Sequence, residues 1–231
     1  MKEEDIFQQS KQVWEENLKL FPASRLNFPD ENLVRLFSGR YVSVPEPPAK
    51  VMDHGFGHAN NLIYLVTKGY ECGGCEISKH LIDEARKLFE SMGHTVDLKP
   101  IVGLEIPFDD ECFDVVVSWN VLHYNGTYEA VLKVISELHR VLKSGGVLLL
   151  STLHHDNGIS SRMKHLGGGS YLIERESEHD NRQGLTFFST QSEEELAGLF
   201  SQFSKVKTGK VFFDLFNNAE RHAASLIYAV K

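Results

Sequence analysis

The sequence lacks the features that would place it outside ordinary globular proteins. It holds 3 cysteines in 231 residues, and an odd, small number argues against a disulfide scaffold and suits a reducing compartment. The charged residues 1–5 are not followed by an apolar run, which argues against a secretory signal. The longest apolar runs, such as residues 147–150, are strand-length and far too short to cross a bilayer. We therefore expect a cytoplasmic protein without a membrane span.

An excess of positive charge is also missing. The chain has 24 Lys and Arg against 32 Asp and Glu, which gives a formal net charge of −8. Proteins that bind a phosphate backbone need clustered Lys and Arg, so the composition argues against a nucleic-acid substrate. Hydrophobic residues make up 42% of the chain, which is enough for a sizeable core. The length suits one domain with an elaborated edge.

Residues 1–49 read as a helical arm. Apolar side chains fall at helical spacing in the first 20 residues, and Asp30 is placed to cap a short second helix. Prolines at positions 45, 47 and 48 then break regular structure. The aromatic residues of the arm are expected to dock it on the core; alternatively, the arm and residues 153–190 form a lid over an acceptor pocket.

From Lys50 to the end of the chain, strand and helix patterns alternate. Such alternation predicts an α/β domain over residues 50–231: a doubly wound, mostly parallel seven-stranded sheet with helices on both faces. The pattern lapses over residues 153–190, which we expect to be a long loop on the substrate side. A helix is predicted over 192–203, with Ser192 and Glu195 as a capping box. The predicted strands are 51–53, 70–75, 95–101, 113–119, 147–152, 205–213 and 222–230, and the other predicted helices are 60–68, 78–92 and 127–142.

A glycine-rich turn follows the first predicted strand. Asp53 opens it, and Gly55 and Gly57 allow a tight turn and close approach of a ligand. Glu76 ends the second strand about 20 residues later, where a carboxylate accepts hydrogen bonds from ribose hydroxyls. Asn60 stands where a dinucleotide site needs its third glycine, and an acid at the start of the turn suits a cationic ligand tail better than a pyrophosphate. The turn therefore indicates a nucleoside ligand with a cationic tail.

Three ordered motifs resemble those of the class I S-adenosylmethionine-dependent methyltransferases. The turn at 53–59 resembles the family's (Asp/Glu)-x-Gly-x-Gly-x-Gly, with Ala59 in place of the last glycine. IPFDDECFD at 106–114 resembles the family's LPF-x-D-x-x-FD, and ELHRVLKSGG at 137–146 resembles its E-x-x-RVLKPGG. The resemblance covers residues 50–152 well and 190–231 loosely. It implies a Rossmann-like methyltransferase fold, with S-adenosylmethionine as cofactor and S-adenosylhomocysteine as product.

The resemblance also assigns the methionine end of the cofactor. Gly55, Phe56 and Gly57 would contact the methionine part, and Asp53 would lie near its ammonium group. Asn120, after the fourth strand, would face the same moiety.

The adenosine end is assigned in the same way. Glu76 would hold the ribose and Ile77 would lie against the adenine, with Gly103 and Leu104 beside the adenine edge. Val102 is a departure, because many members carry an Asp there, before the adenine-facing backbone.

Three histidines are candidates for catalysis. The cofactor supplies an activated methyl group, so the protein mainly contributes positioning and desolvation, but an oxygen nucleophile also benefits from a general base. His154 and His155 follow the fifth strand, and we expect one of them to be this base. His123, after the fourth strand, is a further candidate. The alternative is that these are loop histidines with structural hydrogen bonds, His123 packing behind the cofactor.

Two other groups of residues have the chemistry of metal or redox sites. His155, Asp156, His165 and His179 fit no standard zinc spacing, so we expect no metal. The Cys-x-x-Cys run at Cys72–Cys75 lies in a predicted strand and not at the start of a helix. We interpret it as a run of small residues that allows close packing.

The sequence thus predicts a methyltransferase that acts on a small-molecule or saccharide acceptor, at oxygen or nitrogen. Two alternatives remain open. The first is a non-catalytic cofactor-binding module, because Ala59 and Val102 depart from the family's motifs. A nicotinamide-dependent oxidoreductase is disfavoured by the missing third glycine and by the two later motifs.

Overall fold

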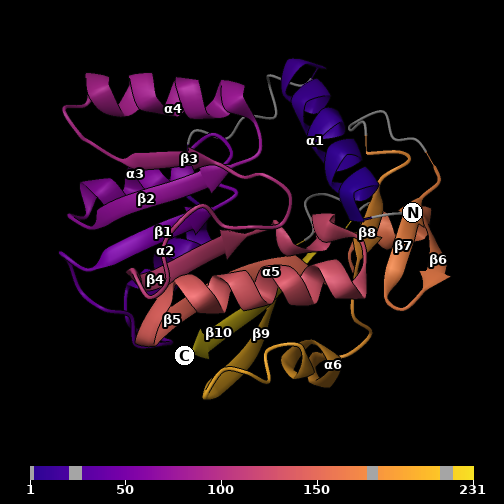
Figure 1. Cartoon of the computed structure of the whole chain (residues 1–231). Coiled ribbons are helices and arrows are strands. Elements are labelled where there is room, and N and C mark those ends of the chain that lie inside the picture. Colours follow the sequence, from indigo (N-terminus) through magenta and orange to yellow (C-terminus); the bar gives the residue numbers. More distant parts are fainter. Residues whose placement is uncertain (1–2, 21–27, 176–181, 214–220) are drawn as a thin grey trace.

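The computed structural model describes residues 3–20, 28–175, 182–213 and 221–231, and it is built around one seven-stranded sheet (Figure 1). The strand order is β3-β2-β1-β4-β5-β10-β9. β10 runs antiparallel to both β5 and β9, and the remaining pairs are parallel. The predicted mostly parallel, doubly wound sheet is therefore confirmed. Its strands are β1 (Lys50–His54), β2 (Glu71–Glu76), β3 (Asp97–Pro100), β4 (Phe113–Trp119), β5 (Leu142–Leu153), β9 (Lys205–Phe213) and β10 (His222–Val230).

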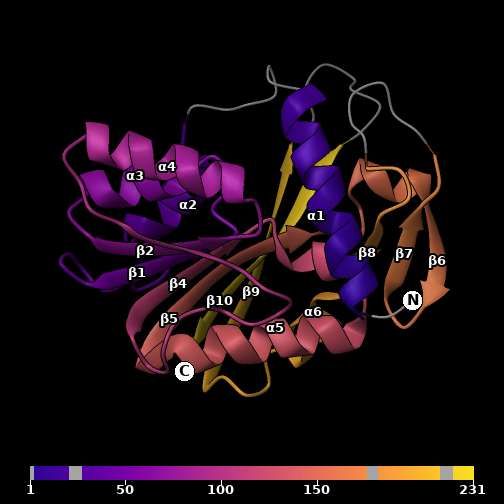
Figure 2. The same cartoon turned by 45° about the horizontal axis from the view of Figure 1, so that its top comes forward.

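Helices cover both faces of the sheet (Figure 2). α2 (Glu31–Phe37), α3 (Asn60–Thr67) and α4 (Lys79–Ser91) lie on one face, and α5 (Tyr128–Val141) and α6 (Glu193–Gly198) lie on the other. Because side chains alternate along a strand, β4 supplies both cores. Val115 and Val117 pack with Leu33 of α2, and Val116 packs with the apolar face of α5.

The prediction of a long loop over residues 153–190 was wrong. A short 3₁₀ helix, η3 (Gly158–Arg162), leads into a separate antiparallel sheet with the order β6-β7-β8. Its strands are β6 (Met163–Gly167), β7 (Ser170–Ile173) and β8 (Thr186–Phe188). The periodicity failed because β6 buries none of its side chains, so it carries no apolar alternation, and the glycine run at 167–169 is the hairpin turn.

Helix α1 (Glu3–Leu20) lies at the carboxyl ends of the parallel strands, between α4 and the small sheet (Figures 1 and 2). Ser10 donates from Oγ to the carbonyl of Tyr124, 3.1 Å away, in η2 (Leu122–Asn125). Gln9 donates from Nε2 to the carbonyl of Gly184, 2.9 Å away, just before β8. α1 is thus fixed to both the sheet edge and the insertion.

Helix α6 is shorter than the predicted 192–203 helix. Ser192 caps it as expected, because its Oγ accepts from the Glu195 N–H at 3.1 Å. The Glu195 carboxylate accepts from Gln191 N and not from Ser192 N, so the second half of the capping box is displaced by one residue. In the described part of the chain, no helix is both long and apolar enough to span a bilayer.

Candidate functional site

The glycine-rich turn leaves β1 in a conformation that only small residues adopt easily. Gly55, Gly57 and Ala59 have φ values of +69°, +53° and +61°. A Cβ added to Gly55 would lie 2.5 Å from Cγ2 of Val121, so the turn passes too close to the end of β4 for any side chain there. Ala59 keeps the left-handed backbone of the glycine it replaces, which costs about 1 kcal/mol in an L-residue.

Glu76 ties the end of β2 to this turn. Its Oε2 accepts from the Gly57 N–H at 3.0 Å, and its Oε1 accepts from Ile77 N and Ser78 N at 2.8 and 3.1 Å. The side chain is 3% exposed, and burial raises the pKa of the carboxyl group against these three hydrogen bonds, which lower it. The sequence-predicted acid therefore lies directly beside the last glycine of the turn.

Asp53 is buried at the base of the same turn and is 1% exposed. Among the described residues, its Oδ2 has no hydrogen-bond partner. Burial and the nearby Glu76 charge together raise the pKa of Asp53 well above its usual range. A buried carboxyl oxygen without a partner is costly, and a cationic ligand group would satisfy it.

A small cavity of about 70 Å³ lies next to Glu76, on the Ile77 side. Ile77, Gly103 and Leu104, which the family resemblance assigns to the adenine end of the cofactor, line it. Val102 does not reach this space, because it is 77% exposed. The predicted adenine-edge residues are therefore brought together with Ile77 at one cavity.

Most of the other residues at this cavity were not predicted as cofactor residues, and those of β1 and α1 are examples. His54 lines it from the end of β1, and Ile6, Phe7 and Ser10 line it from α1. Strand alternation was a signal for His54, since Met52, two residues earlier, points into the core on that face. The docking site of α1 had no such signal, because helical periodicity does not say which surface a helix covers.

The remaining predicted cofactor residues take different places. Asn120 follows β4 with φ +59°, and its Oδ1 accepts from Ser151 Oγ at 2.9 Å, which fixes its side chain at the sheet edge. The ring of Phe56 is instead buried against Gly74 and Leu62, so only its backbone faces the turn.

The packing interpretation of the Cys-x-x-Cys run is confirmed. A Cβ on Gly74 would lie 2.8 Å from the Phe56 ring and 2.9 Å from Leu62. Cys72 and Cys75 are free thiols, and burial raises the pKa of Cys72 to about 12.

Comparison with known proteins favours the methyltransferase interpretation of this fold over the nicotinamide one. Residues 52–150 match the family described as "Methyltransferase domain", over the stretch that carries the three motifs. This match, over less than half of the chain, supports a class I S-adenosylmethionine-dependent methyltransferase. S-adenosylmethionine is the cofactor that these enzymes use, so the nicotinamide alternative is set aside.

Individual methyltransferases are similar to this one over part of their length. "Probable tRNA methyltransferase 9B" of Mus musculus is 28% identical over 111 residues, which are 48% of this chain and 23% of that protein. Sarcosine/dimethylglycine N-methyltransferase of Halorhodospira halochloris is 28% identical over 108 residues, which are 46% of this chain and 38% of that one. This chain thus spans less than half the length of either relative.

A solved structure shares the fold over all of this chain. It is phosphoethanolamine N-methyltransferase 2 of Haemonchus contortus, in complex with phosphomonomethylethanolamine and S-adenosylhomocysteine. The TM-score is 0.66 at 15% identity, covering 100% of this chain and 60% of that one.

The residues of this chain fit S-adenosylmethionine at two points. The Glu76 carboxylate beside Gly57 suits ribose hydroxyls, and the unpartnered Asp53 Oδ2 suits an ammonium group. The cavity itself is far smaller than the roughly 300 Å³ at which ligand pockets begin. This cavity alone is therefore too small for a nucleoside.

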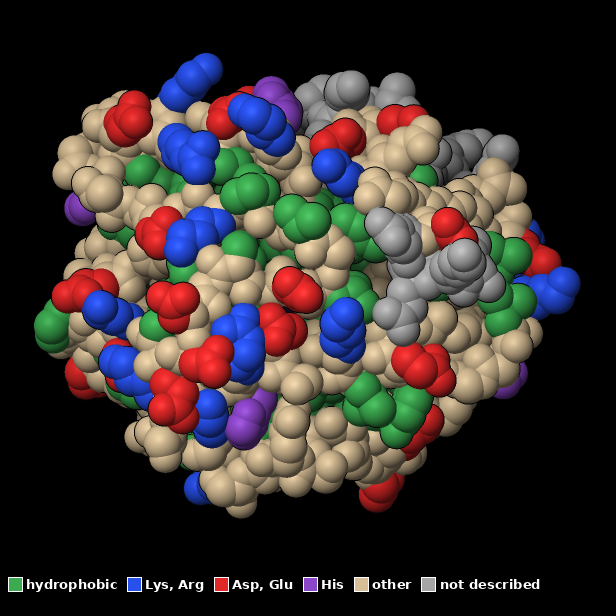
Figure 3. All heavy atoms as spheres, viewed as in Figure 1, with side chains coloured by type: hydrophobic (Ala, Val, Ile, Leu, Met, Phe, Trp, Pro, Cys, Tyr) green, Lys and Arg blue, Asp and Glu red, His purple; other side chains and the backbone are tan. Residues whose placement is uncertain are grey.

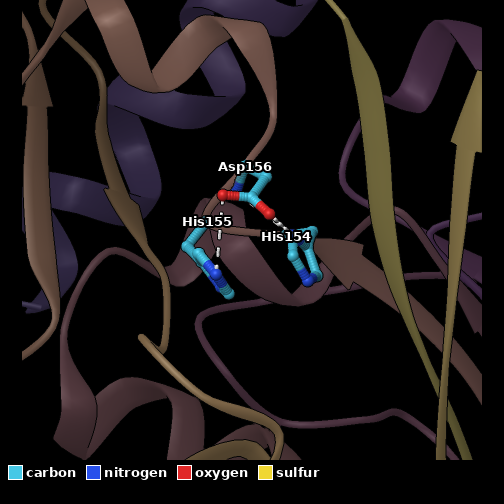
Figure 4. Close-up of side chains that lie close together, drawn as sticks. All are labelled: His154, His155 and Asp156. Carbon is cyan, nitrogen blue, oxygen red and sulfur yellow. Dashed lines mark hydrogen bonds and ion pairs between the residues drawn. The ribbon is translucent and has the colours of Figure 1, made fainter.

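His154, His155 and Asp156 gather at the carboxyl end of β5 (Figure 4). His155 Nε2 lies 3.6 Å from Asp156 Oδ1, and the two imidazole rings stack with centroids 4.1 Å apart. His154 Nδ1 accepts from the Asp156 N–H at 3.1 Å, and burial is the main cause of a lowered His154 pKa. One possible ligand atom from each of the three residues lies within 4.8 Å of the others, so the trio could hold a metal ion as well as exchange a proton.

His123 lies apart from this trio, in the packing between η2 and the small sheet. It is 5% exposed and its ring packs against Tyr124 and Phe187, with centroids 4.5 and 4.9 Å away. Burial lowers the pKa of His123 to about 3, so the ring is neutral at physiological pH. This environment matches the structural alternative for His123.

Proposed function

We propose that this chain transfers the methyl group of S-adenosylmethionine to a small-molecule or saccharide acceptor at the carboxyl edge of the sheet. The observation that carries the proposal is the geometry of the glycine-rich turn. There the Glu76 carboxylate accepts a hydrogen bond from the Gly57 N–H, and Asp53 has a buried oxygen without a partner among the described residues. The bound cofactor supplies an activated methyl group, so the protein's part is to hold it, orient the acceptor and exclude water. The contacts that fix α1 to η2 and the insertion support water exclusion.

The charge distribution favours a small acceptor over a nucleic acid. On the face shown in Figure 3, blue and red side chains are interspersed, and Lys and Arg form no continuous patch. The net charge of −8 adds to this, since a phosphate backbone requires clustered positive charge. Of the three similar proteins described above, one has tRNA in its name, and the names of the other two contain small amines.

His155 is the better candidate for a general base if the acceptor atom is oxygen. Its side chain is 33% exposed, whereas that of His154 is 4% exposed and has Nδ1 occupied. Asp156, 3.6 Å from His155 Nε2, would hold the ring and stabilise its protonated form. An amine acceptor that is already unprotonated needs no such base. The effect of substituting His155 therefore distinguishes an oxygen acceptor from an amine acceptor.

The proposal is tested by incubating the protein with S-adenosylmethionine and panels of small alcohols, phenols, amines, saccharides and unmodified tRNA, and measuring S-adenosylhomocysteine release. We expect release with a member of a small-molecule or saccharide panel. Release with tRNA alone would contradict the acceptor class, and cofactor binding without release on any panel would favour the non-catalytic module.

A substitution at the base sharpens this test. With an oxygen acceptor, His155→Gln should lower kcat by about 10²- to 10⁴-fold and remove the acid limb of the pH–rate profile. His80→Gln, at an exposed histidine on α4, is the matched control and should leave kcat unchanged. An unchanged kcat in His155→Gln with an oxygen acceptor would remove His155 from the mechanism.

A further inference from the structure

One buried polar group at the cavity has no role in the proposed transfer. His54 ends β1, lies inside the glycine-rich motif between Asp53 and Gly55, and is 5% exposed. It lines the cavity beside Ile77, Gly103 and Leu104. A histidine buried this deeply needs hydrogen-bond partners for both ring nitrogens.

Only one of the two nitrogens is bonded. Nδ1 of His54 lies 3.0 Å from Oγ of Ser118, its register partner on β4. Nε2 has no hydrogen bond among the described residues and is not one of the fully buried atoms without a partner there, so it is open to the cavity. The imidazole therefore brings an unused polar atom to a cavity whose neighbouring walls are largely apolar.

The hydrogen-bond network assigns the tautomer. Ser118 is 0% exposed, and within the described residues His54 Nδ1 is the one partner of its hydroxyl. If Nδ1 carried the proton, the hydroxyl hydrogen would be buried without an acceptor, which is unfavourable. Ser118 therefore donates to Nδ1, and the proton of the neutral ring is on Nε2. Burial lowers the pKa of His54 to about 4, so the ring is neutral at physiological pH.

The loop that faces His54 offers no competing side chain. Ile101, Gly103 and Leu104 line the cavity with apolar groups, and Val102 points away from it. Polar recognition of a ligand in this cavity must come from backbone groups, from the sheet edge, or from Ser10, Tyr124 and Asn125, which line it on the α1 and η2 side. His54 supplies a fixed donor at that edge.

We infer that His54 recognises the base of the cofactor, donating from Nε2 to a ring nitrogen of adenine. The inference rests on the proposed function, because the position of Glu76 at the ribose places the base on the Ile77 side of the turn. Adenine carries unprotonated ring nitrogens as acceptors, and flat apolar walls suit its faces. Ser118 acts as a positioning residue that keeps the proton on Nε2.

The test is calorimetric titration with S-adenosylhomocysteine and its 1-deaza, 3-deaza and 7-deaza analogues, each of which lacks one ring nitrogen. The proteins are the wild type, Ser118→Ala, His54→Leu, and the His54→Leu/Ser118→Ala double variant, in which no hydroxyl is buried without a partner. Thermal denaturation of each shows whether it is folded.

We expect the double variant to bind S-adenosylhomocysteine about tenfold more weakly than the wild type, the magnitude of one buried hydrogen bond. One deaza analogue should bind the wild type more weakly than S-adenosylhomocysteine does, by a similar factor. The double variant should bind that analogue and S-adenosylhomocysteine equally well. Equal losses on both proteins for all three analogues would overturn the inference while leaving the proposed function intact. Failure of the wild type to bind S-adenosylhomocysteine would overturn both.

Discussion

At the scale of single residues, the site contains buried carboxyl groups whose ionisation lowers the stability of the ligand-free protein. Asp53 has a buried oxygen without a partner in the described structure, and the Glu76 charge acts on it. Such a group destabilises the ligand-free protein when it ionises. A cationic ligand reverses this effect by favouring the ionised form.

Asp53→Asn should therefore make the ligand-free protein more stable and its ligand binding weaker. Because the pKa of Asp53 is raised on folding, the wild type loses stability as pH rises through that pKa, and the amide does not. The stability difference between the two proteins should grow with pH, and S-adenosylhomocysteine affinity should fall about tenfold or more in the variant. Denaturant unfolding at several pH values and calorimetry measure both. A variant that binds as tightly as the wild type would remove Asp53 from the site.

At the scale of elements, the docking of α1 depends on a glycine. Gly126, between η2 and α5, has φ +72°, and a Cβ there would lie 2.9 Å from Ile6 Cγ2 and 3.0 Å from the Thr186 carbonyl. A side chain at this position would push against both α1 and β8.

Gly126→Ala should lower the free energy of unfolding by about 2 kcal/mol, from backbone strain and overpacking together. Gly126→Ala should cost less in an Ile6→Ala background than in the wild type, since one of the two close contacts is gone, so the two effects should be less than additive. Gly93→Ala is the matched control, because its φ is also positive but no atom lies within 4 Å of an added Cβ. If both glycine variants lose the same stability, α1 does not pack on Gly126 as described.

Some elements of this fold could be predicted from the sequence and others could not. The strand and helix positions from β1 to β5 followed from apolar runs and capping residues, because each element buries its own pattern in a core. The Glu76–Gly57 pairing followed from motif spacing. The small sheet of the insertion and the docking of α1 did not follow, because exposed strands and helix packing partners leave no local periodicity.

At the scale of the whole molecule, two buried histidines connect stability to pH. Burial lowers the pKa of His54 to about 4 and that of His123 to about 3. The unfolded chain takes up protons on these residues near pH 6.5, whereas the folded chain does not. Their contribution to stability is therefore complete above pH 6.5 and is lost as pH falls toward those lower values.

His123→Phe isolates one of these protons while keeping a ring against Tyr124 and Phe187. Below pH 6.5, the wild type should lose up to about 1.4 kcal/mol per pH unit more than the variant. Urea unfolding between pH 4.5 and 8 measures the two slopes. Parallel curves would mean that His123 is protonated in the folded protein.

The central claim is that the turn between β1 and α3, with Glu76 beside it, binds S-adenosylmethionine and its product. Calorimetric titration of the full chain with S-adenosylhomocysteine, with NAD as comparison and Glu71→Ala as an exposed control on the same strand, tests it most directly. The account predicts micromolar binding of S-adenosylhomocysteine that is lost in Glu76→Ala and kept in Glu71→Ala, with weaker or no binding of NAD. Absence of binding, tighter binding of NAD, or binding unchanged in Glu76→Ala would contradict it.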